Sequence, residues 1–162
     1  MNYAAPAFEA KLCAPGDLAA RIALLPRPLV FTNGCFDILH RGHVTYLAQA
    51  RALGAGLVVA ANSDASVKRL GKGDDRPLNR LEDRMALLAA LECVSLVTWF
   101  DEDTPLQRIL DVHPDILVKG GDWAVENIVG YGEVSGWGGQ VHSIPFIHQR
   151  STTALLEKIR RL

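Results

Sequence analysis

Two histidines, His40 and His43, lie three positions apart with Gly42 between them, at the end of a segment that reads FTNGCFDILHRGH. In this segment an apolar run of strand length breaks at Asn33 and Gly34, and a helical pattern resumes at the histidines. Side chains three positions apart share one face of a helix. The first helical turn also presents unpaired backbone N–H groups and the positive end of the helix dipole. We therefore predict that this strand-to-helix turn binds a phosphate group.

Length and composition predict a single domain with a small partner. The 162 residues are 49% apolar, and a chain of this length buries roughly 70% of its unfolded surface. A net charge of −1, from 17 basic and 18 acidic residues, offers no charged surface to a nucleic acid or an anionic membrane. Cys13, Cys35 and Cys93 follow neither a zinc pattern nor a disulfide framework, which predicts free thiols. Because we find neither a leader pattern nor an apolar run near the ~18 residues of a membrane span, we expect a cytoplasmic protein.

The rest of the sequence alternates strand patterns with helix patterns. Strands are predicted at 29–33, 57–62, 95–100, 116–118 and 140–144, and helices at 44–53, 64–70, 81–91, 104–112 and 151–162. Another helix is predicted at 18–25, inside an N-terminal extension of residues 1–28. Ser63 is a candidate N-cap, and Asn79 with Glu82 resembles a capping box. A glycine-rich segment, 120–139, separates the last two strands.

Strands and helices that alternate in this way form right-handed crossover units. The sequence therefore predicts an α/β fold: a Rossmann-like, doubly wound parallel sheet of about five strands with flanking helices, in a single domain. Ligands of such sheets bind beyond the carboxyl ends of the strands. Segments 33–43, 62–64 and 119–123 follow three of the predicted strands, so we expect them to meet in one site.

The segment 32–43, together with Ser151–Thr153 before the last helix, resembles the HxGH nucleotidyltransferase superfamily. The segments Asn62–Asp64, Asp75–Pro77, Glu82–Met85 and Val118–Asp122 are similar, in that order, to the sugar 1-phosphate adenylyltransferases of ADP-heptose synthesis. This resemblance covers about residues 30–159, and it identifies residues 29–162 as the nucleotidyltransferase domain. Many such relatives carry a fused sugar kinase, which this sequence does not show, so it resembles the stand-alone form.

The resemblance implies adenylyl transfer from ATP to D-glycero-β-D-manno-heptose 1-phosphate, which gives ADP-heptose and pyrophosphate for the lipopolysaccharide core. A sugar phosphate oxygen attacks the α-phosphorus in line; it is already anionic, so no general base is needed. Mg²⁺ is carried by the ATP phosphates, and no protein metal site is expected. The missing side chains of Gly120 and Gly121 would let a nucleotide approach the backbone. Relatives also imply a homo-oligomer, a dimer or larger.

The same resemblance implies three groups of site residues. The catalytic group is His40, His43, Lys72 and Arg84. The substrate-binding group is Asp37, Asp64 and Arg76. The nucleotide-binding group is Thr32, Asn33, Gly34, Cys35, Phe36, Gly42, Asn62, Lys119, Gly120, Asp122, Ser151, Thr152 and Thr153.

Two alternatives remain open at this point. One is a cytidylyltransferase that acts on a polyol phosphate such as glycerol 3-phosphate. That branch carries an arginine where this chain has Phe146, and a phosphate contact either moves to His148 or Arg150 or is absent. The other alternative is a nucleotide-binding sensor without catalytic activity, against which both histidines and the serine-threonine motif are intact. An NAD-binding domain is disfavoured because no G-x-G-x-x-G follows the first strand.

Overall fold

A computed structural model describes residues 3–71, 73, 75–148 and 152–161 of the chain. Its centre is one five-stranded sheet in the order β3-β2-β1-β4-β5, and every pair of neighbouring strands is parallel. The strands are β1 (Leu29–Gly34), β2 (Gly56–Asn62), β3 (Leu96–Phe100), β4 (Ile116–Gly120) and β5 (Gln140–Ile144). This architecture confirms the predicted Rossmann-like α/β fold.

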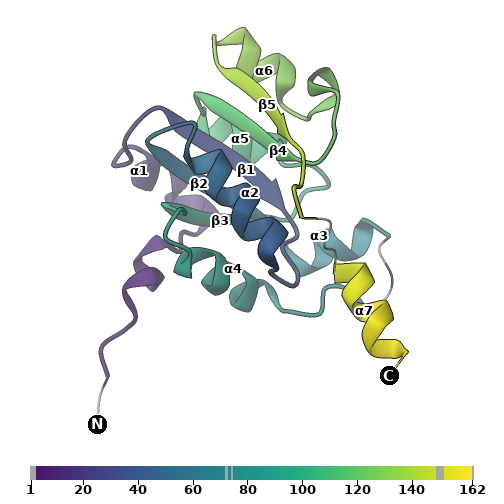
Figure 1. The fold of residues 1–162 in the computed structure, drawn as a ribbon. Helices are drawn as coiled ribbons and strands as arrows, with labels where there is room; N and C mark the ends of the chain where they lie inside the picture. The colour runs from purple at the N-terminus through teal and green to yellow at the C-terminus, as the bar shows by residue number, and fades with distance from the viewer. Residues whose placement is uncertain (1–2, 72, 74, 149–151, 162) are drawn as a thin grey trace.

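Helices cover both faces of the sheet, and each face has its own apolar core (Figure 1). On one face α2 (Arg41–Arg51) and α4 (Leu81–Ala90) pack against side chains such as Val59 and Val97. The opposite face carries α1 (Leu18–Ile22), α5 (Leu106–Val112) and α6 (Tyr131–Gly136). Strand β2 is buried along its whole length. Its continuous apolar pattern is therefore that of a strand between two helical layers.

Three other parts of the chain complete the fold. Short helix α3 (Asp64–Arg69) follows β2, and α7 (Thr152–Arg160), drawn in yellow in Figure 1, follows β5 and leads to the C-terminus. Single 3₁₀ turns occur at Ala7–Lys11, Pro15–Asp17 and Val125–Asn127. The N-terminal segment packs on the edge of the sheet, because the Cys13 N–H donates to the Val97 carbonyl of β3 at 2.9 Å. Among the residues described, no helix is long and apolar enough to cross a membrane.

Local sequence signals gave mixed results. The Ser63 N-cap is confirmed, since its Oγ accepts from the Ser66 N–H at 3.0 Å. The capping box at Asn79 is wrong: α4 begins after Arg80 without a side-chain cap, and Asn79 Nδ2 donates to the Asp37 carbonyl instead. Helix α2 begins at Arg41 rather than at residue 44. The histidine turn is thus the start of the helix itself.

Helix α6 lies inside the glycine-rich segment and has no sequence prediction, because glycine disfavours helices. Gly130 precedes it with φ +90°, a left-handed conformation that suits glycine. Buried Val134 anchors α6 on the sheet. Tertiary packing therefore outweighs the weak intrinsic helix propensity here.

Candidate active site

The carboxyl ends of β1, β2 and β4 surround a cavity of about 380 Å³. Five of the predicted nucleotide-binding residues line it: Asn33, Gly34, Cys35, Asn62 and Lys119. The three strand-end segments therefore meet in one site, as the strand topology requires. Trp123, from the predicted segment 119–123, also lines the cavity. The sequence prediction did not include the other residues of the cavity wall, which are Leu70, Asp103, Thr104, Pro105, Asn127, Ile128 and Val129.

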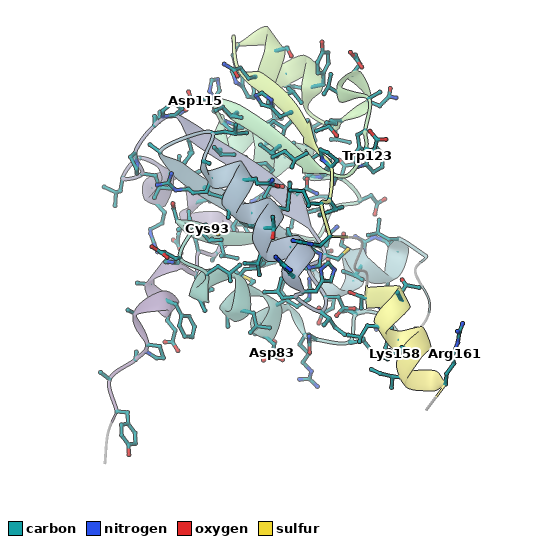
Figure 2. All side chains as sticks on the ribbon, viewed as in Figure 1. Asp83, Cys93, Asp115, Trp123, Lys158 and Arg161 are labelled. Carbon is teal, nitrogen blue, oxygen red and sulfur yellow. The ribbon has the colours of Figure 1, made fainter. Side chains whose placement is uncertain are left out.

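Some of these missed residues carried a signal that the sequence analysis did not use. Asp103 to Pro105 follow β3, so the strand-end rule applies to them as well. Figure 2 shows Trp123 and Asp115 at opposite ends of β4. The Trp123 indole Nε1–H donates to the Gly120 carbonyl at 3.2 Å, and its backbone N–H donates to Ser143 Oγ at 3.0 Å. The indole is therefore held beside the turn that follows β4.

The two histidines lie together at the start of α2. Their rings stack with centroids 3.8 Å apart and an interplanar angle of 20°. His40 occupies the N-cap position, and its side chain does not cap the helix. A Cβ at Gly42 would lie 3.0 Å from the His40 ring and 3.1 Å from the His148 carbonyl oxygen. Glycine at this position thus allows the ring and the chain after β5 to approach the first turn of α2.

His43 is an electrically neutral donor at physiological pH. Burial and, to a smaller extent, the neighbouring His40 lower the pKa of His43 to about 4, although a hydrogen bond with the Ile38 backbone acts in the opposite direction. The rings of Phe36 and Phe146 meet the imidazole edge to face, with centroid distances of 5.4 and 6.4 Å. A neutral imidazole keeps one ring N–H, which can donate to a phosphate oxygen.

Asp37 and Arg76, both predicted to bind substrate, are buried and bound to each other. Arg76 Nε donates to Asp37 Oδ2 at 2.5 Å, and the two side chains are only 8% and 1% exposed. Asp37 Oδ1 also accepts from the backbone N–H groups of Leu78 and Asn79, at 2.9 and 3.0 Å. In this structure the pair joins the histidine turn to the segment before α4 and does not line the cavity.

Arg84, predicted to be catalytic, is completely buried in α4. Its guanidinium donates to the Asn79 carbonyl at 3.1 Å, to the Cys35 carbonyl at 2.6 Å and to Asp64 Oδ1 at 2.7 Å. The predicted substrate ligand Asp64 is thus an ion-pair partner of Arg84. We expected Arg84 to contact a phosphate. In the structure its guanidinium instead holds the turn after β1 and the start of α3.

The turn after β4 also differs from the expectation. We expected a nucleotide to approach the backbone at Gly120 and Gly121, and in the structure aromatic rings lie directly beside both glycines. A Cβ at Gly120 would lie 2.7 Å from Phe146 Cζ, and one at Gly121 would lie 2.6 Å from Trp123 Nε1. Gly121 also has φ +125°, which suits glycine. Asp122, between Gly121 and Trp123 along the chain, is exposed.

The remaining predicted residues have varied surroundings. The Thr32 hydroxyl is buried and 2.5 Å from the Tyr46 hydroxyl. Asn62 Nδ2 donates to Ser66 Oγ at 3.0 Å. Phe36 is buried with φ +48°. At the start of α7, Thr152 is buried and Thr153 is exposed, whereas Lys72, Arg150 and Ser151 lie outside the described residues.

The parallel sheet, the cavity beyond its carboxyl ends and the paired histidines at the start of α2 define a site of the nucleotidyltransferase class. The model of the family described as "Cytidylyltransferase-like" matches residues 31–155, and the chain belongs to this family. Membership confirms the class predicted from the histidine motif: the protein is a nucleotidyltransferase.

Individual proteins with known names are also similar to this chain. Over 156 residues the chain is 60% identical to D-beta-D-heptose 1-phosphate adenylyltransferase of Bordetella bronchiseptica, covering 95% of this chain and 96% of that protein. It is also 60% identical over 134 residues to the bifunctional protein HldE of Hahella chejuensis, but this match spans only 28% of that longer protein and 82% of this chain. Among solved structures, the lipopolysaccharide core biosynthesis protein of Thermoplasma volcanium aligns with a TM-score of 0.62 and 28% identity, over 75% of this chain and 98% of that one.

Proposed function

We propose that the protein transfers an adenylyl group from ATP to D-glycero-β-D-manno-heptose 1-phosphate and so produces ADP-heptose for lipopolysaccharide core synthesis. The observation that carries this proposal is the 60% identity to a protein named for this activity, along nearly the whole length of both chains. The histidine pair supports it, because it lies at the start of α2, where a phosphate chain can meet backbone N–H groups. The cavity at the carboxyl ends of the strands supports it as the place for the nucleotide, although neither histidine lines that cavity.

In the proposed reaction one sugar phosphate oxygen forms a bond to the α-phosphorus of ATP, and the bond from that phosphorus to the bridging oxygen breaks. Pyrophosphate leaves with the electron pair of that bond. The attacking oxygen is already anionic, so no proton has to be removed from it. Catalysis then depends on aligning two anionic groups and stabilising the charge that develops on the leaving group. Hydrogen-bond donors at fixed positions meet this need.

We assign the donor role to His40, His43 and the backbone N–H groups at the start of α2. His43 is neutral, because burial keeps its pKa near 4, and can donate through one ring nitrogen. The proposed nucleotide contacts come from Asn33, Gly34, Asn62 and Lys119, which line the cavity. Lys72 and Ser151–Thr153 keep their predicted phosphate roles as part of this proposal.

Arg84, Asp64, Asp37 and Arg76 have a supporting role in this proposal. The guanidinium of Arg84 is enclosed by protein acceptors, and Asp37 and Arg76 satisfy each other. These contacts fix the turn after β1 and the start of α3, which both border the cavity. A rigid turn matters because small displacements of donors lose much of their effect on the transition state.

Mg²⁺ is proposed to enter with ATP. Within the described ranges, no group of three or more His, Cys, Asp or Glu side chains could hold a metal ion, whereas Mg²⁺ is commonly bound through substrate phosphates. The proposed partners are ATP and a sugar 1-phosphate, and the proposal includes neither a nucleic acid nor a membrane partner. The proposed location is the cytoplasm. A homo-oligomer is also part of the proposal.

The test is pyrophosphate release with Mg²⁺, crossing ATP and CTP against D-glycero-β-D-manno-heptose 1-phosphate and glycerol 3-phosphate. We expect release with ATP and the heptose phosphate only. Release with CTP and glycerol 3-phosphate would instead establish the cytidylyltransferase alternative, and no release with any pair would favour the sensor. His43→Ala should reduce turnover by about 100-fold or more. His142→Ala, in β5 and bonded to Gln140 at 3.1 Å, is the matched control that should keep it.

A further inference from the structure

The ring of Phe146 connects the histidine site with the turn after β4. Phe146 follows β5 by two residues and meets His43 edge to face at an interplanar angle of 85°. It meets Tyr46 in the same way, with centroids 5.5 Å apart and an angle of 65°. His43 is thereby packed against Phe36 and Phe146 and stacked on His40. Phe146 itself is 40% exposed, so it is not an ordinary core residue.

Gly120 leaves room for this ring. A Cβ there would lie 2.7 Å from Phe146 Cζ and 3.2 Å from both Phe146 Cε1 and Tyr46 Cε2. Gly120 is not among the residues with positive φ, so its backbone conformation suits any residue. An alanine at this position would therefore have to displace the Phe146 ring.

Tyr46 gives the Phe146 ring a fixed support. Its hydroxyl lies 2.5 Å from Thr32 Oγ1 and donates to the Val118 carbonyl at 3.3 Å, and the side chain is buried. These contacts connect α2 to β1 and β4. A ring that rests on Tyr46 can therefore hold its own neighbour, His43, in one orientation.

We propose that Phe146 is a positioning residue for His43: the Phe146 ring holds the imidazole against the start of α2 and excludes water from it. The absence of a side chain at Gly120 admits this ring. The proposal deepens the proposed function and rests on it only for its kinetic consequence. The packing itself can be tested without substrate. Among the described titratable groups, His40 is the one whose charge lowers the pKa of His43. None of the variants below replaces His40.

The experiment is an NMR titration of His43 in the full chain, with the signal assigned by its loss in His43→Gln. In Phe146→Ala the pKa of His43 should rise from about 4 to above about 5, because water reaches the imidazole. Phe146→Leu, which keeps an apolar side chain, should give a smaller rise. The matched control is Ile147→Ala, because Ile147 is next to Phe146 in the chain and its side chain is 65% exposed. In this variant the pKa of His43 should be the same as in the wild type.

Gly120→Ala provides a second route to the same displacement. It should raise the pKa of His43 as Phe146→Ala does, and the double variant should raise it no further, because both changes remove the same contact. An unchanged pKa of His43 in folded Phe146→Ala and Gly120→Ala would overturn the proposal. So would a double variant in which the two effects add.

Kinetics separate this proposal from the proposed function. In Phe146→Ala, kcat should fall by about 10-fold with little change in KM for ATP, because the donor is misplaced while ATP still binds. A raised KM with unchanged kcat would instead make Phe146 a ligand contact and overturn the positioning role. If no nucleotide and acceptor pair reacts, the proposed function fails, and the titration still decides whether Phe146 positions His43.

Discussion

Neutralising Asp37 is expected to destabilise the protein strongly, because its carboxylate faces a buried arginine. The two side chains are 1% and 8% exposed and 2.5 Å apart. Asp37→Asn keeps the size of the side chain and an oxygen for the backbone N–H groups of Leu78 and Asn79. It leaves the Arg76 guanidinium buried without its counter-charge, and breaking a buried pair in this way costs about 3–5 kcal/mol.

The assay is urea unfolding of Asp37→Asn, Arg76→Gln and the double variant. Because each single variant breaks the same pair, we expect the double variant to be more stable than the sum of the two single effects predicts, by about 2 kcal/mol. Asp103→Asn is the control, since Asp103 pairs with Arg69 at 2.7 Å on the surface, with side chains 78% and 45% exposed. Its urea midpoint should stay close to that of the wild type, because exposed ion pairs contribute little to stability.

Two results would refute this reasoning. Additive single effects would mean that Asp37 and Arg76 do not interact in the folded protein. An Asp37→Asn variant of unchanged stability but raised KM for the sugar phosphate would restore the direct substrate contact that the sequence analysis predicted for both residues.

Three further predictions concern single side chains. First, the pKa of His43 is about 4 in the folded protein, below its ordinary 6.5. Between these two pH values the unfolded chain therefore binds more protons than the folded one. The contribution of neutral His43 to the free energy of unfolding is complete above pH 6.5 and is lost as the pH falls toward 4. Urea unfolding should show wild type losing about 2 kcal/mol relative to His43→Gln between pH 7 and pH 5, and parallel pH profiles would contradict this. Second, Gly130→Ala should destabilise by about 1–3 kcal/mol because of its φ of +90° and a Cβ 2.7 Å from Ile109 Cδ1, whereas Gly132→Ala, with open space around its Cβ, should be neutral or stabilising in thermal unfolding. Third, Tyr46→Phe should lower the free energy of unfolding by about 1–2 kcal/mol, because the buried Thr32 hydroxyl and Val118 carbonyl lose their partner; a variant as stable as wild type would place a water there.

Much of the fold could be predicted because its signals are local. β1 to β4 each contain an apolar run, whereas β5 (Gln140–Ile144) contains two apolar residues and is only partly buried. Strands that alternate with helices in this way favour a parallel sheet. The Ser63 N-cap was predicted for the same reason, since its partner is only three residues away. Helix α6 was missed because its sequence disfavours a helix and its stability comes from packing through Val134.

The sequence by itself determined where the site lies. Strand-end segments converge in any parallel sheet, so Asn33, Asn62 and Lys119 were expected near one another, and they line one cavity. The histidine motif also indicated a turn from strand to helix, although the helix was predicted from residue 44 and begins at Arg41. These inferences needed no knowledge of which side chains touch.

Only the tertiary structure decided what each polar or small residue contacts. Asp37 is separated from Arg76 by 39 positions, and Arg84 from Cys35 by 49. A charged side chain reads the same in sequence whether it faces a substrate or a buried counter-charge, and a glycine reads the same whether a nucleotide or Phe146 fills its space. The folded chain distinguishes these cases, because burial and the partner within hydrogen-bond distance arise only when distant segments pack together.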